Sequence, residues 1–237
     1  TATLVAGEWT LTGTKAAVVG GAHADSFAVV ARDRDENRPG VFLVAADTEG
    51  VSAPEVLDPG LGVADLVFDG VPATPLLAPG TDATASIERA SQQAVVAMAL
   101  HAVGASRRIF EVTLDYAKVR EQYDRIIGSF QALKHRFADM YLGVERANAV
   151  GYFAALAIAE DDERRAEATH LAKATAGQCQ RLLSEDGLQL HGGIGYTWEH
   201  DLHFLLKRAK ASELLCGSSA FHRARLAEML GLAEVAA

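Results

Sequence analysis

The chain has 237 residues and a net charge of −9, with 49% hydrophobic and 22% charged residues. This composition is typical of an ordinary globular protein with one large domain or two small ones. Because nucleic-acid affinity comes largely from the neutralisation of phosphates, so acidic a chain is a poor general nucleic-acid binder.

No apolar run is long enough to cross a bilayer and no signal peptide is apparent, so no membrane partner is predicted. The two cysteines, Cys179 and Cys216, form neither a disulfide framework nor a metal-spaced cluster. These features together predict a cytoplasmic protein.

Residues 1–78 alternate short apolar runs with turns that contain Gly or Pro. Runs of this length and spacing, rich in β-branched residues, are typical of an all-β sandwich or barrel. We therefore predict a small antiparallel β-domain. Its predicted strand cores are Ala16–Val19, Phe27–Ala31, Val41–Ala45 and Leu66–Phe68.

Residues 79–84 form a predicted linker, and helical periodicity dominates the proline-free residues 85–237. The pattern predicts a four-helix-type bundle, so the fold class is α+β. The predicted helices cover residues 85–118, 129–160, 163–186, 201–217 and a last segment that ends near Leu230.

Residue types mark several helix boundaries. We expect Gly187 to end the third helix and Asp201 to begin the fourth, and Ser218 or Ser219 to cap the last one. The first two helices are too long for one thin layer to bury their apolar stripes. A partner chain is therefore predicted.

A polar cluster begins at Arg120 and continues to Gln131. Arg120 is a permanent cation with a forked set of donors, which suits a pyrophosphate. Gln131 offers hydrogen bonds to an adenine, a ribose or a phosphate. Taken alone, the cluster has a simpler interpretation as exposed residues without a ligand.

A second cluster, Gln189–Tyr196, reads QLHGGIGY. Its glycines allow the backbone to approach another molecule closely and to present amide N–H groups to an anion. A lone Gly-rich loop is more often just a turn between helices.

Together, the two clusters resemble the flavin signatures of the acyl-CoA dehydrogenase family. One signature is Arg-x-x-Phe-Gly with Gln eleven residues after the Arg. Arg120, Tyr123 and Gln131 fit it, with Tyr in place of Phe and Asp124 where Gly is usual. The other, Gln-x-x-Gly-Gly-x-Gly-Tyr, matches the second cluster. The segments 7–15 and 207–210 resemble two further motifs of the family, Gly-x-Trp-x-Leu-x-Gly-x-Lys and Arg-x-Ala-Lys.

The resemblance implies an acyl-CoA dehydrogenase-like fold without the family's N-terminal helical domain, and a shared FAD site. In the family, these motifs of one subunit hold the adenine and pyrophosphate end of the FAD whose flavin ring lies in the neighbouring subunit. The residues that would grip a partner's FAD in this way are Arg120, Tyr123, Phe130, Gln131, Gln189, Leu190, His191, Gly192 and Gly193.

The sequence departs from the family where the reaction takes place. Family members use a carboxylate to remove the α-proton of an acyl-CoA while the flavin accepts a β-hydride. The usual position of that carboxylate holds Cys216. The alternative position, on the first long helix of some branched-chain members, aligns with Ala94, and its neighbour is Val95.

The β-domain departs in the same way. After the Lys of the hairpin motif, here Lys15, the family often has Trp-Ile-Thr, whose Trp and Thr contact the flavin ring. Ala17 and Val19 stand in those places. No catalytic residue is therefore predicted in this chain.

This pattern favours the non-catalytic subunit of a heteromeric FAD-dependent acyl-CoA dehydrogenase. The predicted partner is a catalytic acyl-CoA dehydrogenase subunit, in an α2β2 assembly, that binds most of the acyl-CoA. The resemblance further implies an electron-acceptor flavoprotein, and an actinobacterial enzyme for a steroid side-chain CoA ester as a possible context.

Three alternatives stay open. The chain could be a self-sufficient acyl-CoA dehydrogenase with a displaced base, such as Glu88 or Glu213. It could be a DNA-binding protein of the same fold, although the net charge argues against this, or a structural subunit without flavin. No metal is predicted, because His200 and His203 lack further ligands on their helix face.

Overall fold

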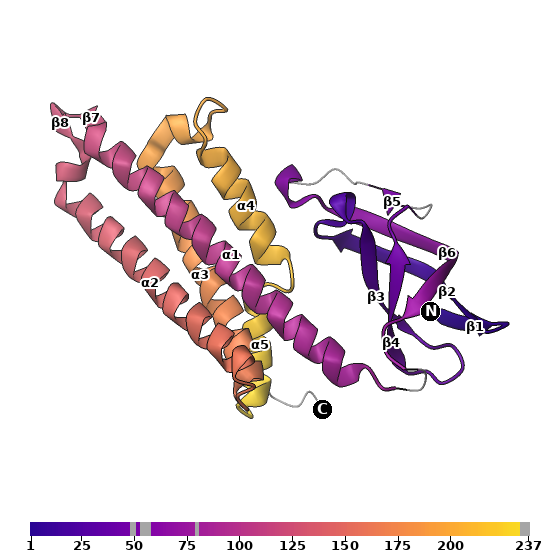
Figure 1. Cartoon of the computed structure of the whole chain (residues 1–237). Helices are drawn as coiled ribbons and strands as arrows, with labels where there is room; N and C mark the ends of the chain where they lie inside the picture. The colour runs from indigo at the N-terminus through magenta and orange to yellow at the C-terminus, as the bar shows by residue number, and fades with distance from the viewer. Residues whose placement is uncertain (48–50, 53–57, 79–80, 233–237) are drawn as a thin grey trace. The chain divides into compact units, whose positions relative to one another are not determined.

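The structure is a computed structural model, and it describes residues 1–47, 51–52, 58–78 and 81–232 (Figure 1). The chain divides into two compact units, Thr1–Ser91 and Gln92–Ala237. Residues 79 and 80 of the predicted linker lie outside the described residues.

The first unit contains an antiparallel sheet, as predicted. Its order along the main path is β1-β2-β6-β4-β3, and β5 pairs with β6. Strand β6 joins the β1-β2 side of the sheet to the β4-β3 side. It pairs with β2 as far as Ala73 and with β4 at Thr74 and Pro75. The described strands are β1 (Ala2–Val5), β2 (Glu8–Val18), β3 (Ser26–Arg32), β4 (Pro39–Ala45), β5 (Val51–Ser52) and β6 (Ala64–Pro75).

Side chains that alternate along the strands between the two faces of the sheet build the core of this unit. In β3, Phe27 and Val29 are buried while their neighbours along the strand are exposed. They pack in one cluster with Leu11, Phe42 and Leu66 from β2, β4 and β6. The predicted apolar runs therefore lie in strands, except that β2 ends at Val18 and Val19 lies in a turn.

The helical unit contains most of α1 and all of the later helices (Figure 1). Its core includes Ile109, Met140, Val144, Leu183 and Leu202, each no more than 1% exposed. None of the helices in the described ranges is both long and apolar enough to cross a membrane. The helices are α1 (Thr84–Val119), α2 (Gln131–Ala159), α3 (Arg165–His191), α4 (Leu202–Leu214) and α5 (Ser219–Met229).

The prediction that Gly187 ends the third helix is wrong. Helix α3 continues to His191, and Gly187 lies inside it, where α3 meets α1. A Cβ atom at this position would lie 2.7 Å from Cγ2 of Ile109 and 3.3 Å from Oγ1 of Thr113. Close approach of two helices, rather than chain termination, therefore explains this glycine.

Gly187→Ala should destabilise the helical unit by about 1–3 kcal/mol, because the added methyl group overpacks the contact between the helices. The matched control is Gly104→Ala, because a Cβ atom at Gly104 would meet nothing within 4 Å. That change should stabilise α1 by about 0.5–1 kcal/mol. Urea unfolding of both variants measures the difference, and equal stabilities would contradict the packing explanation.

The end of α4 also differs from its prediction. Helix α4 stops at Leu214 rather than near residue 217, because Cys216 and Gly217 have φ angles of 57° and 95°. These left-handed angles cannot continue a right-handed helix. Ser218 then caps α5, since its hydroxyl accepts a hydrogen bond from the backbone N–H of Phe221 at 3.3 Å.

Candidate cofactor-binding site

A tight hairpin presents the first predicted cluster. Strands β7 (Glu121–Gln122) and β8 (Arg125–Ile126) pair directly after α1. The two turn residues, Tyr123 and Asp124, have φ angles of 56° and 59°, as a two-residue type I′ turn requires. The hairpin leaves Arg120 exposed and Tyr123 87% exposed.

The start of α2 forms the other side of this cluster. Phe130 precedes the helix, and its ring lies under the guanidinium of Arg125, with 3.8 Å from Cζ to the ring centroid. The Tyr123 ring meets the Phe130 ring edge-on at 6.2 Å. No side chain caps the N-terminus of α2, where Gln131 is the exposed first residue. The free N–H groups of such a terminus attract an anion.

The second cluster forms a short helical turn after α3. The turn covers Gly192–Tyr196, and Gly192 has a φ angle of 63°. A Cβ atom at Gly192 or Gly193 would meet nothing within 4 Å, so the backbone here is open to another molecule. Gly195 is different, because a Cβ atom added at this position would lie 3.0 Å from Cβ of His191. Gly195 therefore serves packing within the chain.

An aromatic stack brings the two clusters to the same end of the bundle (Figure 1). Tyr116, one turn before Arg120, stacks on His191 with 4.6 Å between ring centroids and 19° between planes. His200 meets the His191 ring at 4.6 Å. The ends of α1 and α3 are thus joined directly, which the sequence motifs did not indicate.

The predicted residues of the second cluster play unequal parts. Gln189 is exposed, whereas the side chains of Leu190 and His191 are 8% and 4% exposed. The Nδ1 atom of His191 lies 2.8 Å from the carbonyl oxygen of Gly187, while Nε2 is buried without a partner among the described atoms. Leu190 and His191 therefore orient the loop from inside. Gln189 and the side chains of Ile194 and Tyr196, 41% and 74% exposed, face outward.

Acidification should weaken the helical unit. Burial lowers the pKa of His191, His170 and His222 below the ordinary 6.5. The unfolded chain then takes up these protons at a higher pH than the folded chain, so stability falls as the pH drops below 6.5. In His191→Phe this dependence should be shallower by about one proton.

Urea unfolding at about pH 7.5 and about pH 5.5 measures this dependence. The control is His135→Gln, because His135 is an exposed histidine of α2. It should leave the dependence unchanged. An unaltered dependence in His191→Phe would contradict the expected loss of a proton-linked group.

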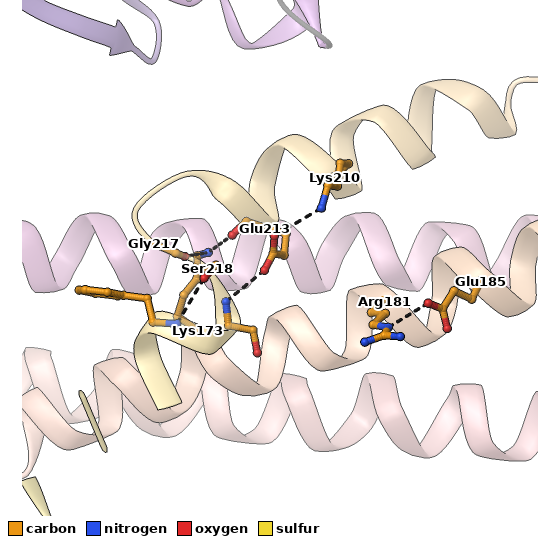
Figure 2. Close-up of polar contacts among 9 residues, drawn as sticks. Lys173, Arg181, Glu185, Lys210, Glu213, Gly217 and Ser218 are labelled. Atoms are coloured by element: carbon orange, nitrogen blue, oxygen red, sulfur yellow. Dashed lines mark hydrogen bonds and ion pairs between the residues drawn. The ribbon is translucent and has the colours of Figure 1, made fainter. Parts of the chain in front are cut away.

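The turn that carries Cys216 is held from inside by buried side chains. The Lys173 ammonium, 1% exposed, donates to the carbonyl oxygens of Glu213 at 3.0 Å and of Gly217 at 2.7 Å (Figure 2). Nε2 of His222 lies 2.8 Å from the carbonyl oxygen of Cys216. Cys216 itself is exposed. Sequence reasoning missed Lys173, although a lysine within an alanine-rich helical stripe was a signal for it.

The two carboxylates considered as displaced bases are placed differently. Glu213 belongs to the framework of the turn: its Oε1 accepts from the backbone N–H of Ser219 at 3.1 Å, and its Oε2 lies 3.8 Å from Nζ of Lys210 (Figure 2). Glu88 is exposed and belongs to the first compact unit. Ala94 is exposed and Val95 half-buried on α1.

The two positions that were expected to lack flavin contacts lie at the irregular end of β2 and directly after it. Ala17 has a φ angle of 55°, and its N–H donates to Oδ1 of Asp65 at 2.7 Å. Ala17 and Val19 are both exposed. A hollow of about 420 Å³ adjoins them, lined mainly by small and apolar side chains such as Ala16, Val18 and Val19.

Metal chemistry has no support in the described ranges, where no group of three or more His, Cys, Asp or Glu residues is arranged to hold an ion. His200 and His203 instead make aromatic contacts. The His200 ring meets Tyr116 at 6.3 Å, and the His203 ring meets Trp198 at 4.7 Å.

Both units match family models. Residues 1–71 match the model described as "Acyl-CoA dehydrogenase, middle domain", and residues 86–231 match "Acyl-CoA dehydrogenase, C-terminal domain". With the β-domain and bundle in the same order, these matches show that the chain belongs to the acyl-CoA dehydrogenase family.

Several mycobacterial acyl-CoA dehydrogenases are similar to this chain in sequence. Acyl-CoA dehydrogenase IpdE2 of Mycobacterium tuberculosis is 42% identical over 125 residues, which are 53% of this chain and 37% of that protein. FadE27 of the same organism is 34% identical over 88% of this chain and 57% of its own length. The chain therefore spans less than two thirds of these relatives.

Solved structures agree in fold. The ChsE4-ChsE5 complex from Mycobacterium tuberculosis matches with a TM-score of 0.83 and 29% identity, over 99% of this chain and 63% of that one. A Tcur3481-Tcur3483 steroid ACAD variant matches with a TM-score of 0.81 and 30% identity, over 97% and 62%.

Proposed function

We propose that this chain is the non-catalytic subunit of a heteromeric FAD-dependent acyl-CoA dehydrogenase, and that it completes the FAD site of a catalytic partner. The observation that carries the proposal is a contrast between two places in the helical unit. Arg120 is exposed beside the hairpin, where the motifs for the FAD tail lie, whereas the turn after α4 presents Cys216 in place of a base.

The open end fits the phosphate part of FAD. Arg120 and the N-terminus of α2 offer positive charge, and Gly192 and Gly193 leave their backbone uncovered. Tyr123 and Gln131, both exposed, complete a polar and aromatic rim. When bound, FAD supplies the hydride acceptor of the reaction, while these residues bind and orient its tail.

The lack of a base supports assigning the chemistry to the partner. Cys216 offers a thiol where the family uses a carboxylate to remove the α-proton. The carboxylate of Glu213 accepts a hydrogen bond from the backbone N–H of Ser219 and lies near the ammonium of Lys210. It is therefore poorly suited to abstract a proton. These contacts disfavour a self-sufficient enzyme with a displaced base.

An exposed apolar surface supports the need for a partner. Along α2, Tyr141, Leu142, Tyr152 and Leu156 are between 50% and 66% exposed. A large apolar surface of this kind is typical of a subunit interface. A heteromeric α2β2 assembly would cover it.

The proposed substrate class is a steroid side-chain CoA ester, which the partner subunit would bind for the most part. The support is similarity alone: the Tcur3481-Tcur3483 pair is described as a steroid ACAD, and ChsE4-ChsE5 is a complex of two unlike chains. This chain resembles both across nearly its whole length.

The deciding experiment is co-expression with a catalytic acyl-CoA dehydrogenase subunit, followed by a count of FAD per chain. We expect one FAD for each pair of unlike chains and none on this chain alone. One FAD on each copy of the isolated chain, together with turnover of an acyl-CoA, would sink the proposal. Restoring a base alone, by Cys216→Glu, should leave the isolated chain inactive.

A further inference from the structure

We infer that His170 of α3 and His222 of α5 form a proton-sharing pair that makes the turn after α4 sensitive to pH. The turn covers residues 215–218 and joins α4 to α5. With both imidazoles protonated, the pair breaks and the turn is released. The pair and the turn lie within the helical unit, so the inference does not rest on the proposed function.

The two imidazoles meet directly. Their Nδ1 atoms lie 2.8 Å apart, with 5.0 Å between the ring centroids. His222 is 1% exposed and His170 is half-buried. On its other side, Nε2 of His222 lies 2.8 Å from the carbonyl oxygen of Cys216. A chain of hydrogen bonds therefore runs from α3 through α5 to the turn.

The imidazole of His222 also packs closely against the turn. A Cβ atom added at Gly217 would lie 2.9 Å from Nε2 of His222 and 2.8 Å from Cδ1 of Phe221. The Phe221 ring meets the His222 ring edge-on at 5.1 Å. In a close-packed interior a displaced ring displaces its neighbours, so movement of His222 is transmitted to the turn.

The hydrogen-bond pattern fixes where the protons lie. A carbonyl oxygen only accepts, so Nε2 of His222 carries a proton. In the neutral pair, Nδ1 of His222 is then bare and accepts from the Nδ1–H of His170. One further proton can bind to Nε2 of His170 and leave both hydrogen bonds intact. A second places protons on both Nδ1 atoms, which then repel each other across 2.8 Å.

The surroundings of the pair oppose its protonation. Burial lowers the pKa of His170, and the charge of Arg225 adds to this shift while Glu228 opposes it. Arg225 and Glu228 themselves form an ion pair at 2.7 Å on α5. Burial also lowers the pKa of His222; the hydrogen bond to the turn opposes this shift, whereas His170 and Lys173 add to it.

These directions decide the sign of the pH effect. The charged groups from the other neighbours, Glu213 of α4 and the thiol of Cys216, act on the ammonium of Lys173. Because both imidazoles have a lowered pKa in the closed turn, the open turn binds protons more readily. The closed turn is therefore favoured above the ordinary histidine pKa of 6.5 and loses stability as the pH falls below it.

The first test is an NMR measurement of the imidazole nitrogen shifts in the full chain at about pH 7.5. We expect His222 to carry its proton on Nε2 and His170 to carry its proton on Nδ1. The unaltered protein suffices here, so the result does not depend on whether a variant folds. A proton on Nε2 of His170 instead would leave none between the two rings and would overturn the inference.

The second test is amide hydrogen exchange at the turn, corrected for intrinsic rates. The N–H of Leu215 donates to the carbonyl oxygen of Ala211, and the N–H of Ser219 donates to Oε1 of Glu213, both at 3.1 Å. The open turn takes up two protons where the closed turn accepts one. Protection of both amides should therefore fall about tenfold between pH 6.5 and about pH 5.5.

His170→Gln separates the pair from a general effect of acid. A glutamine amide can donate to neutral His222 or accept from protonated His222, so it keeps the contact at either pH. In this variant the protection of Leu215 and Ser219 should fall by less than about threefold. The matched control is His135→Gln at an exposed histidine of α2, which should retain the tenfold fall. The same fall in His170→Gln as in the unaltered chain, or no fall in the unaltered chain, would overturn the inference.

Discussion

Arg120→Ala should leave the assembled complex largely without FAD while the chain stays folded. Arg120 is exposed and follows the last residue of α1, so its side chain contributes little to the core. In the proposed arrangement it donates charge-assisted hydrogen bonds to the pyrophosphate of the partner's FAD. A loss of about 1.5–3 kcal/mol corresponds to FAD binding that is roughly 10- to 100-fold weaker.

The measurement is the flavin content of the co-purified complex, read from its absorbance spectrum, together with the stability of the variant. Arg108→Ala is the matched control, because Arg108 is an exposed arginine of the same helix that pairs with Glu111 at 3.1 Å. It should retain normal flavin. Full flavin content in Arg120→Ala would mean that the hairpin does not hold the cofactor.

Lys173→Ala should cost the helical unit about 2–4 kcal/mol. The change removes two hydrogen bonds from a buried ammonium and leaves the carbonyl oxygens of Glu213 and Gly217 without that donor. Glu213 lies in the last turn of α4, where carbonyl groups have no partner within the helix. Lys173 therefore binds the last turn of α4 to the turn at Cys216.

Urea unfolding measures the loss, and hydrogen exchange at residues 215–218 measures the loosening of the turn. Lys173→Met keeps most of the side-chain volume, so it separates the lost hydrogen bonds from the cavity. Lys134→Ala, at an exposed position of α2, should change stability by less than about 0.5 kcal/mol. A similarly small effect of Lys173→Ala would refute its role as a tether.

Local patterns predicted most of the fold. The helix from 84 to 119 was expected at 85–118, because its apolar spacing and the absence of proline are properties of that segment alone. The apolar run Phe27–Ala31 likewise predicted β3, although only the structure shows that Phe27 and Val29 face inward. The family motifs at Arg120 and Gln189 were found for the same reason, since each is a short run of residues.

Contacts between distant segments could not be read in this way. Gly187 looked like a helix end, because its role depends on where α1 passes and not on its neighbours in sequence. The signal for Lys173 was present, but its partners lie 40 and 44 residues away. The stack of Tyr116 on His191 joins segments that are farther apart still.

The sequence by itself predicted most of the secondary structure, the family and the surface proposed to hold the tail of FAD, because these predictions follow from local periodicity and short motifs. The tertiary structure decided which buried groups are satisfied and which are not. It pairs Lys173 with two main-chain carbonyls, and it leaves the amide of Gln180 without a partner in a groove lined by three helices. Hydrogen-bond satisfaction is a property of packed neighbours, so only the folded arrangement of α3, α4 and α5 reveals it.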